Sequence, residues 1–180
     1  EAGTLLTTDK RVDLISFTGS DKGGAMIQAQ AAPTLKRCLM ELGGKSALIV
    51  RADANMMEAA QAALGGFITH CGQGCALTTR MLVHNSIRRQ FVQMIAGMLG
   101  HVKVGNPVDP SVSCGPLIRE VARKRTEDYV QIALDEGAKL IAGGKRPDGF
   151  DKGFYYEPTL FDDVDNKSRL DQEEVFGPIG

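Results

Sequence analysis

The sequence contains no long hydrophobic run, and its apolar stretches, such as residues 47–50, are only as long as a strand. A helix that crosses a membrane needs about 20 consecutive apolar residues, so we expect no transmembrane segment. A charged-then-apolar leader is also missing. The chain starts with Glu1 instead of methionine and ends in Gly180 without a polar tail, so we expect both ends to continue in a longer protein.

An excess of charge of one sign is missing as well. The 21 Lys and Arg residues nearly balance the 22 Asp and Glu residues, for a formal net charge of −1. This balance provides no electrostatic basis for binding nucleic acid or an anionic membrane, and we expect neither as a partner. The sequence also lacks internal repeats and low-complexity segments.

Cysteine is scarce, and the four residues at positions 38, 71, 75 and 114 have no spacing typical of a disulfide framework. We predict reduced thiols in a cytoplasmic protein, since disulfides persist mainly in oxidising compartments. A metal site at His70, Cys71 and Cys75 is disfavoured, because no second ligand pair exists elsewhere. A redox pair of Cys71 and Cys75 is a further alternative, but their spacing is not the usual C-x₂-C.

The remaining composition is typical of a globular protein, with 43% hydrophobic and 24% charged residues. The 180 residues suffice for one domain or parts of two. Short apolar runs alternate with amphipathic stretches, which predicts an α/β architecture with a parallel-dominated sheet and helices on both faces. We expect strands at residues 12–17, 35–42, 47–50, 80–84, 139–142 and 155–160, and helices at residues 25–32, 54–69, 85–99 and 119–136.

Helix capping and the glycine pair at residues 65–66 add local expectations. Asp53 is a good N-cap for the second helix, and Asn85 or Ser86 for the third. Two glycines inside the second helix predict close packing against another stretch of backbone. Because the first 42 residues hold too few strands for a sheet of their own, we expect those strands to be exposed or paired with another chain.

The chemistry of the chain centres on the stretch from Glu41 to Cys75. Glu41 opens the run Glu-Leu-Gly-Gly-Lys-Ser, and Cys75 closes the run Cys-Gly-Gln-Gly-Cys. The connection reads as a turn, a strand and a helix, which can bring its two ends into one pocket. A cysteine with a nearby base can act as a nucleophile, and a glutamate can act as a general base. Lys45 is a possible catalytic cation, but a lone lysine after a turn is more often solvated.

Two further segments have the composition of ligand sites. Residues 12–17 form a predicted strand followed by Thr18-Gly19-Ser20 and a helix, which is the arrangement that directs backbone N–H groups at a phosphate. As a bare pattern it also fits an ordinary turn capped by Ser20 or Asp21. The second segment, residues 171–178, could equally be a solvated acidic helix end.

Taken together and in this order, these four segments resemble the aldehyde dehydrogenase family. The resemblance rests on residues 17–24, 41–46, 72–75 and 173–178. It implies that Cys75 is the nucleophile and Glu41 the general base. It also implies that Glu174 accepts hydrogen bonds from the nicotinamide ribose and that Phe176 packs near the nicotinamide. The remaining residues for which it implies contact with NAD or NADP are Gly19, Ser20, Gly24, Leu42 and Gly43.

The family resemblance also implies an activity and a domain plan. The activity is oxidation of an aldehyde to a carboxylic acid, because members that release an acyl-coenzyme A typically lack the glutamate found here as Glu41. Residues 1–42 would be the end of the coenzyme-binding domain and residues 43–180 most of the catalytic domain. The full-length protein would be a dimer or tetramer, and the 180 residues alone would be inactive.

Two other functional classes compete with this interpretation. The first is a non-catalytic relative that kept the fold for binding or structure, but retention of Cys75, Glu41 and Glu174 together disfavours it. The second is a thioester hydrolase that uses Cys75 and Glu41 without a coenzyme. The coenzyme-type segments at residues 17–24 and 174–176 disfavour that class.

Overall fold

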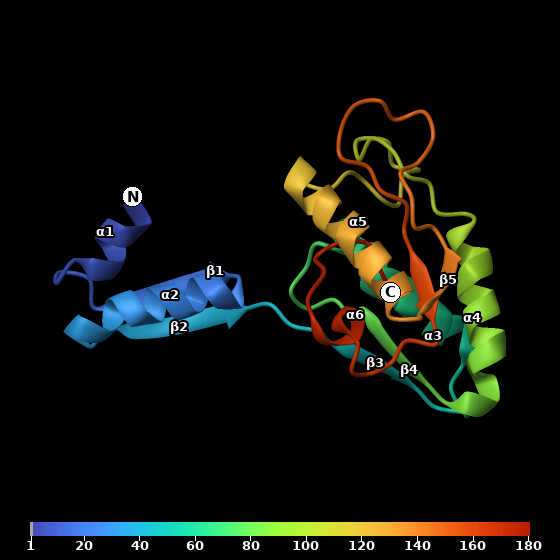
Figure 1. The fold of residues 1–180 in the computed structure, drawn as a ribbon, viewed down its shortest axis with the longest axis horizontal. Coiled ribbons are helices and arrows are strands. Elements are labelled where there is room, and N and C mark those ends of the chain that lie inside the picture. Colours follow the sequence, from blue (N-terminus) through green and yellow to red (C-terminus); the bar gives the residue numbers. More distant parts are fainter. Residues whose placement is uncertain (1) are drawn as a thin grey trace. The chain divides into compact units, whose positions relative to one another are not determined.

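The computed structural model describes residues 2–180 and divides the chain into two compact units (Figure 1). Unit 1 ends at Gly44, and unit 2 comprises Lys45–Gly180. The division falls two residues after the boundary that we expected between residues 42 and 43. No helix among the described residues is long and apolar enough to cross a membrane.

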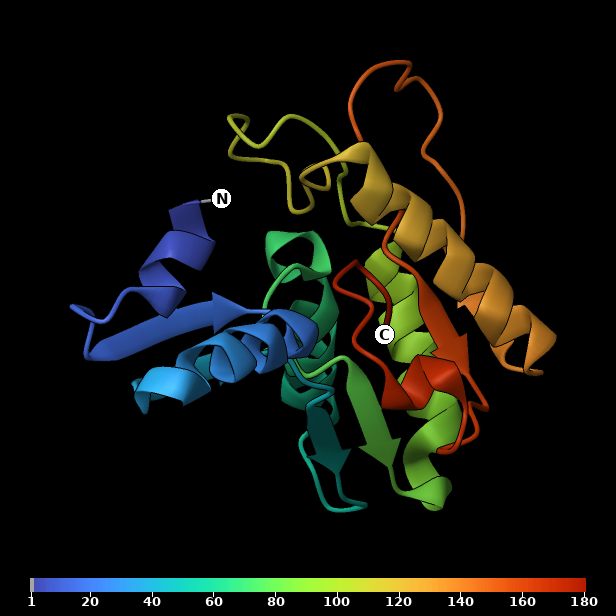
Figure 2. The ribbon, with the colours of Figure 1, turned by 60° about the vertical axis from the view of Figure 1, so that its left-hand side comes forward.

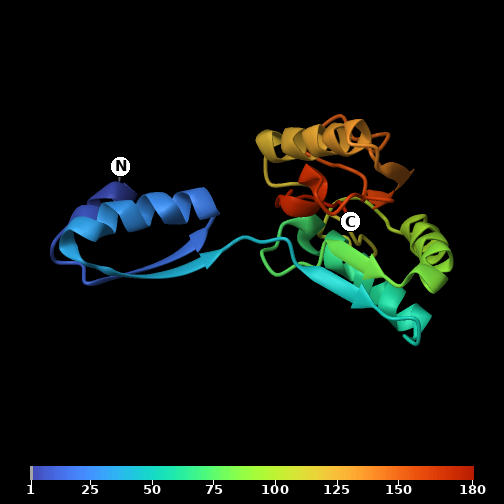
Figure 3. The ribbon, with the colours of Figure 1, turned by 60° about the horizontal axis from the view of Figure 1, so that its bottom comes forward.

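Unit 1 is a two-stranded parallel sheet covered on one face by a helix (Figure 3). Strand β1 pairs with β2 in a register that runs from Leu14 opposite Arg37 to Gly19 opposite Leu42. The two strands therefore pair with each other, and their carboxyl ends lie side by side. The elements of unit 1 are α1 (Ala2–Thr8), β1 (Leu14–Gly19), α2 (Asp21–Ala31), η1 (Ala32–Thr34) and β2 (Arg37–Leu42).

Small residues cap helix α2 at its start and let it pack closely on β2. The Ser20 hydroxyl is the N-cap and accepts a hydrogen bond from the Gly23 N–H at 3.1 Å. A Cβ at Gly24 would lie only 2.8 Å from a Leu42 methyl, so a glycine lets α2 approach β2. After the helix, Leu35 takes a left-handed φ of 54°. For this reason β2 begins at Arg37 and not at Leu35 as predicted.

The face of the β1–β2 pair that turns away from α2 is exposed. Side chains alternate between the two faces of a strand, and Leu14 and Leu39 are 55% and 56% exposed. Glu41 is exposed on the same face of β2 as Leu39. We expected these strands to be exposed or paired with another chain for want of a sheet of their own; instead they pair with each other, and only the outer face of the pair is exposed.

Unit 2 contains two further strand pairs. Strands β3 and β4 are parallel and lie side by side, as Figure 2 shows, whereas β5 and β6 are antiparallel. The predicted α/β class is confirmed, with the described strands arranged as three separate pairs. The elements of unit 2 are β3 (Ala47–Val50), α3 (Met56–Ile68), η2 (Thr69–Gly72), β4 (Arg80–Val83), α4 (Asn85–Leu99), α5 (Glu120–Asp135), β5 (Lys139–Ala142), β6 (Leu160–Asp162) and α6 (Arg169–Gln172).

Three local expectations for unit 2 are wrong. Asn55, not Asp53, caps α3, because its side-chain oxygen accepts from the N–H groups of the next turn while Asp53 pairs with Arg51. His84, not Asn85 or Ser86, caps α4, because its Nδ1 accepts a hydrogen bond from the backbone N–H of residue 86. The segment at residues 155–159 is irregular, and the strand begins only at Leu160.

Two apolar clusters hold unit 2 together. The first lies between α3, α4 and the strands, and the second lies under α5 and the C-terminal segment. Because both clusters draw on elements far apart in the chain, burying them fixes how the helices of this unit pack. Fully buried members of the first are Ala60, Ala63, Phe67, Phe91, Ile95 and Leu160, and of the second Cys71, Cys114, Leu117, Ala133, Tyr156 and Ile179.

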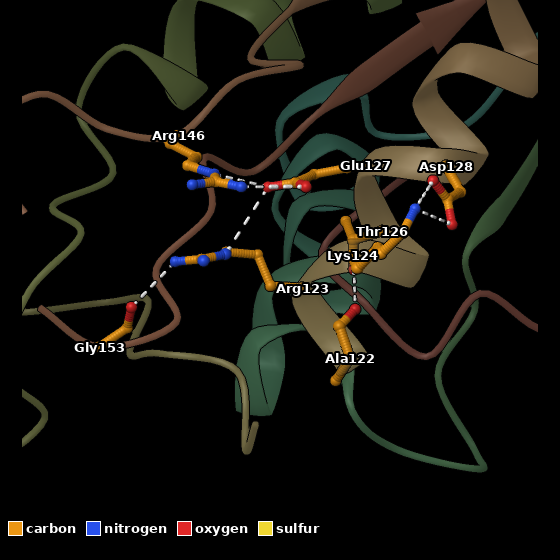
Figure 4. Close-up of polar contacts among 8 residues, drawn as sticks. All are labelled: Ala122, Arg123, Lys124, Thr126, Glu127, Asp128, Arg146 and Gly153. Atoms are coloured by element: carbon orange, nitrogen blue, oxygen red, sulfur yellow. Dashed lines mark hydrogen bonds and ion pairs between the residues drawn. The ribbon is translucent and has the colours of Figure 1, made fainter. Parts of the chain in front are cut away.

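Polar contacts fix the irregular segment between β5 and β6 onto α5. Figure 4 shows Arg146 of that segment and Arg123 of α5 both reaching Glu127, at 2.6 and 3.6 Å. Arg123 also donates to the Gly153 carbonyl at 3.0 Å. On the buried side of α5, Thr126 donates to the Ala122 carbonyl, so its hydroxyl is satisfied without water.

The turn after α3 packs directly against the backbone of the C-terminal segment. Residues His70, Cys71 and Gly72 take φ values of 50°, 57° and 70°, a left-handed turn that costs each non-glycine residue about 1–2 kcal/mol. A Cβ built on Gly72 would collide with the Gly177 carbonyl and the Pro178 nitrogen. The two segments can therefore touch only because residue 72 has no side chain.

We predict that Gly72→Ala destabilises the protein by at least about 2 kcal/mol, because it adds a backbone collision at a position with positive φ. Gly97→Ala is the matched control. Gly97 lies in α4 with nothing near its missing side chain, so alanine there should be neutral or raise stability by up to about 1 kcal/mol. Urea denaturation of the variants measures both, and equal midpoints for Gly72→Ala and the parent protein would contradict the packing argument.

Candidate active site

The predicted general base lies at the carboxyl end of a parallel strand. Glu41 is the penultimate residue of β2 and pairs in register with Thr18 of β1. Carboxyl ends of parallel strands are where α/β proteins place their ligands. Its side chain is exposed, so it is available to solvent and to a substrate.

The residues for which coenzyme contact was predicted in unit 1 gather at the same end of the sheet. Gly19 and Leu42 end their strands opposite each other, and Gly43 follows in an exposed, irregular stretch. Ser20 and Gly24 begin α2 immediately beyond β1. A helix N-terminus behind a strand end is a suitable place for a phosphate. Ser20 and Gly24 also have structural roles, as cap and as packing contact to Leu42.

The predicted nucleophile sits on a tight turn between α3 and β4. Cys75 is exposed, and its segment is fixed on both sides. Before it, Gly72 packs on Gly177. After it, Thr78 lies so close to α3 that a Cβ at Gly66 would be 2.5 Å from the Thr78 hydroxyl and 2.8 Å from its carbonyl. The expected close backbone approach is thus confirmed for Gly66, whereas Gly65 faces open space.

Gln73 clamps the residues that precede Cys75. Its side-chain nitrogen donates to the His70 carbonyl at 3.1 Å, and its side-chain oxygen accepts from the Ile118 N–H at 2.9 Å. The amide therefore links the turn to a loop 45 residues further along the chain. This gives the glutamine of the Gly-Gln-x-Cys motif a positioning role that sequence reasoning did not assign.

Glu174 and Phe176 lie in the C-terminal segment of the same unit. Both are half-buried, and Phe176 has a left-handed φ of 57°. The Arg125 guanidinium lies over the Phe176 ring at 5.9 Å from its centre, a favourable cation–π distance. A strained, half-exposed aromatic residue is typical of a ligand contact, although its contact with a nicotinamide stays a prediction.

Within unit 2, the structure brings the Cys75 turn together with the segment that carries Glu174 and Phe176. The packing of Gly72 on Gly177 is the direct link between these two motifs. Glu41 belongs to unit 1, and its pairing with Cys75 stays a prediction. Within residues 2–180, no cluster of three or more histidine, cysteine or acidic side chains is placed to hold a metal ion.

The expectation that Lys45 is solvated is wrong. Lys45 is half-buried and lines a hollow of about 530 Å³ beside β3 and β4. Burial lowers the pKa of Lys45 to about 8; the Asp171 carboxylate opposes this change, and the Arg80 guanidinium adds to it. Arg80 in turn donates to the Lys45 carbonyl at 2.9 Å and pairs with Asp171 at 3.2 Å. The sequence carried no signal for this burial, because Asp171 is far away along the chain.

We predict that a substantial fraction of Lys45 is uncharged near pH 8. Reductive methylation with isotopically labelled formaldehyde would give each lysine its own NMR signal. One signal should titrate with a pKa of about 8 because its ammonium is held away from water. That signal should be missing in Lys45→Arg, which keeps the positive charge. A titration with no midpoint near pH 8 would show that Lys45 is solvated after all.

Comparison with protein families gives one match over the whole chain. The model of the aldehyde dehydrogenase family matches residues 1–180. Betaine aldehyde dehydrogenase of Bacillus subtilis is 41% identical over 179 residues, which are 98% of this chain and 36% of that protein. A putative aldehyde dehydrogenase of Staphylococcus aureus is 38% identical over 178 residues. The chain thus spans a little over a third of the length of these relatives.

Solved structures agree with the sequence matches. Betaine aldehyde dehydrogenase from Staphylococcus aureus, crystallised with NAD+, aligns with a TM-score of 0.95 at 40% identity. The alignment covers 98% of this chain and 36% of that one. A cysteine-to-alanine mutant of aldehyde dehydrogenase C from Pseudomonas syringae, complexed with NAD+ and octanal, aligns with a TM-score of 0.96 at 36% identity, over 99% of this chain and 37% of that one. The chain belongs to the aldehyde dehydrogenase family.

Proposed function

We propose that this chain works as part of an NAD- or NADP-dependent aldehyde dehydrogenase that converts an aldehyde to a free carboxylic acid through a thioester on Cys75. The observation that carries the proposal is the exposed Cys75 on a turn clamped by Gln73, in a chain of this family. An exposed thiol beside a rigid backbone is what a nucleophile needs to meet its substrate in a fixed geometry.

The first chemical step is attack of the Cys75 thiolate on the aldehyde carbon. The carbonyl oxygen then becomes an oxyanion, which needs hydrogen-bond donors placed in advance, and the backbone N–H of Cys75 is one candidate. The oxyanion expels a hydride from the same carbon and leaves a thioester on the sulfur. When bound, the coenzyme supplies the nicotinamide ring that accepts this hydride.

The second step releases the acid. Glu41 removes a proton from a water molecule, and the resulting hydroxide attacks the thioester carbon and frees the Cys75 sulfur. The exposure of Glu41 at the end of β2 supports this role, because water can reach it. A carboxylate at this point favours hydrolysis over transfer of the acyl group to coenzyme A.

The residues at the start of α2 fit the diphosphate part of the coenzyme. Gly19 and Ser20 are exposed at the strand end, directly before the N-terminus of an 11-residue helix. Backbone N–H groups at such a helix start attract phosphate oxygens. In unit 2, Glu174 has the carboxylate to accept from ribose hydroxyls, and Phe176 offers an aromatic surface to the nicotinamide.

We extend the proposal to the organisation of the whole protein. Residues 1–42 belong to the coenzyme-binding domain and residues 43–180 to the catalytic domain, in a cytoplasmic dimer or tetramer. The 180 residues alone are expected to be inactive, because relatives with NAD+ in their structures are nearly three times as long. The aldehydes named with the relatives, betaine aldehyde and octanal, are the first substrates to test.

We predict opposite kinetic signatures for two variants of the full-length enzyme. Cys75→Ala should abolish formation of reduced coenzyme, because no thioester can form. The absorbance of the reduced coenzyme is the measurement. Glu41→Gln should still give one turnover of reduced coenzyme per site, after which the steady-state rate falls by roughly 100-fold or more because deacylation lacks its base. Rapid-mixing kinetics separate the two phases.

Cys38→Ala is the matched control, since Cys38 lies in β2 three residues from Glu41 and has no proposed role in the reaction. It should keep the parent rate. Normal steady-state turnover of Glu41→Gln would remove Glu41 from its role, and activity of Cys75→Ala would remove Cys75. Thioester hydrolysis without coenzyme would support the hydrolase alternative, and no reaction with any substrate would support a non-catalytic relative.

A further inference from the structure

Two buried cysteine side chains lie close together near the Cys75 turn. Cys71 and Cys114 are 2% and 1% exposed, and both belong to the apolar cluster under α5. Their Sγ atoms are 3.5 Å apart, although 43 residues separate them along the chain. Neither residue has a part in the proposed dehydrogenase chemistry.

The distance leaves these sulfurs one short movement away from a covalent bond. A disulfide has an S–S length of about 2.04 Å, so the two atoms need to approach by about 1.5 Å. Cys71 lies in the left-handed turn after α3, and Cys114 lies in the long connection between α4 and α5. Gly72 holds the Cys71 turn in place, so the approach falls mainly to Cys114, because a loop segment adjusts more readily than the interior of a helix or sheet.

A hollow reaches Cys71 and the neighbours of Cys114. Its volume is about 430 Å³, and it is lined by His70 and Cys71 on one side and by Pro107, Ser113, Gly115 and Pro116 on the other. The residues on either side of Cys114 are therefore part of the wall. A hollow of this size admits a molecule as small as a hydroperoxide, whereas the buried sulfurs are shielded from bulky disulfides.

We propose that Cys71 and Cys114 are a thiol pair that small hydroperoxides oxidise to an intramolecular disulfide. The sulfur of Cys71, a residue that lines the hollow, bonds to one peroxide oxygen as the O–O bond breaks, giving a sulfenic acid and an alcohol or water. The Cys114 sulfur then displaces the hydroxyl, forming the S–S bond and releasing water. The two thiols lose two electrons and two hydrogens to the peroxide, which is reduced.

Burial makes the oxidation chemistry of this pair different from that of the exposed Cys75. The hydrogen bond with Cys114 and burial raise the pKa of the Cys71 thiol, which keeps its reactive thiolate scarce. Oxidation that begins at Cys71 is therefore slower than oxidation of an exposed thiol and needs an excess of peroxide. The product is also more durable, because a buried disulfide is protected from thiol reductants.

Peptide mapping tests the proposal directly. The protein is treated with excess hydrogen peroxide, unfolded in the presence of an alkylating agent, digested without reductant and analysed by mass spectrometry. We expect a peptide pair joined through Cys71 and Cys114, lighter by two hydrogens than the separate peptides, that disappears after dithiothreitol. Oxidation should also raise the thermal unfolding midpoint by several degrees, because the bond closes a 43-residue loop.

Variants separate this pair from the other thiols. The joined peptide should be lost in Cys71→Ser and in Cys114→Ser, and should persist in Cys38→Ser and in Cys75→Ala. The map of the parent protein decides the matter even if a serine variant fails to fold. Because the cross-link does not depend on aldehyde oxidation, its presence in an inactive protein would leave this inference intact and count only against the proposed function.

Two results would overturn the inference. The first is a map in which Cys71 pairs with Cys75 instead of Cys114, which would mean that the exposed turn rearranges and the buried contact is not used. The second is full alkylation of Cys71 and Cys114 after peroxide treatment that has already oxidised Cys75. That outcome would mean that the hollow does not admit the oxidant or that the loops cannot close the last distance.

Discussion

The close approach of Gly72 and Gly177 is the constraint on which unit 2 depends. A side chain at position 72 would collide with the Gly177 carbonyl, and a side chain at position 177 would collide with Thr126 of α5. The turn after α3 therefore packs directly on the backbone of the C-terminal segment, and that backbone packs directly on the Thr126 side chain of α5. Because Cys75 follows Gly72 by three residues, this layering also sets where the candidate nucleophile emerges.

The two units share one local arrangement but differ in how many of their residues are buried. Each has a parallel strand pair next to a helix, which places functional side chains at strand or helix ends. Unit 2 adds two extended apolar clusters, whereas among the described residues of unit 1 only Thr7, Gly24 and Ala31 are buried. The proposed chemistry takes its base from the first unit and its nucleophile from the second.

Much of the local structure could be predicted from the sequence. Hydrophobic periodicity located the main helices and most strands, and the glycine pair in α3 indicated a close backbone contact, which Gly66 makes with Thr78. The N-caps were less accessible, because Asp53 and Asn55 are both good capping residues. Which of them reaches the free N–H groups depends on the backbone path and on Arg51, which draws Asp53 away.

By itself, the sequence determined the α/β class, the order of the elements and the four motifs that mark the family, since these follow from residue type and short-range spacing. Only the tertiary structure decided which side chains leave water. It half-buries Lys45 beside Arg80 and Asp171 and brings the sulfurs of Cys71 and Cys114 within 3.5 Å. Short-range sequence patterns do not predict such contacts, because they form between distant segments that meet only when the apolar clusters are buried.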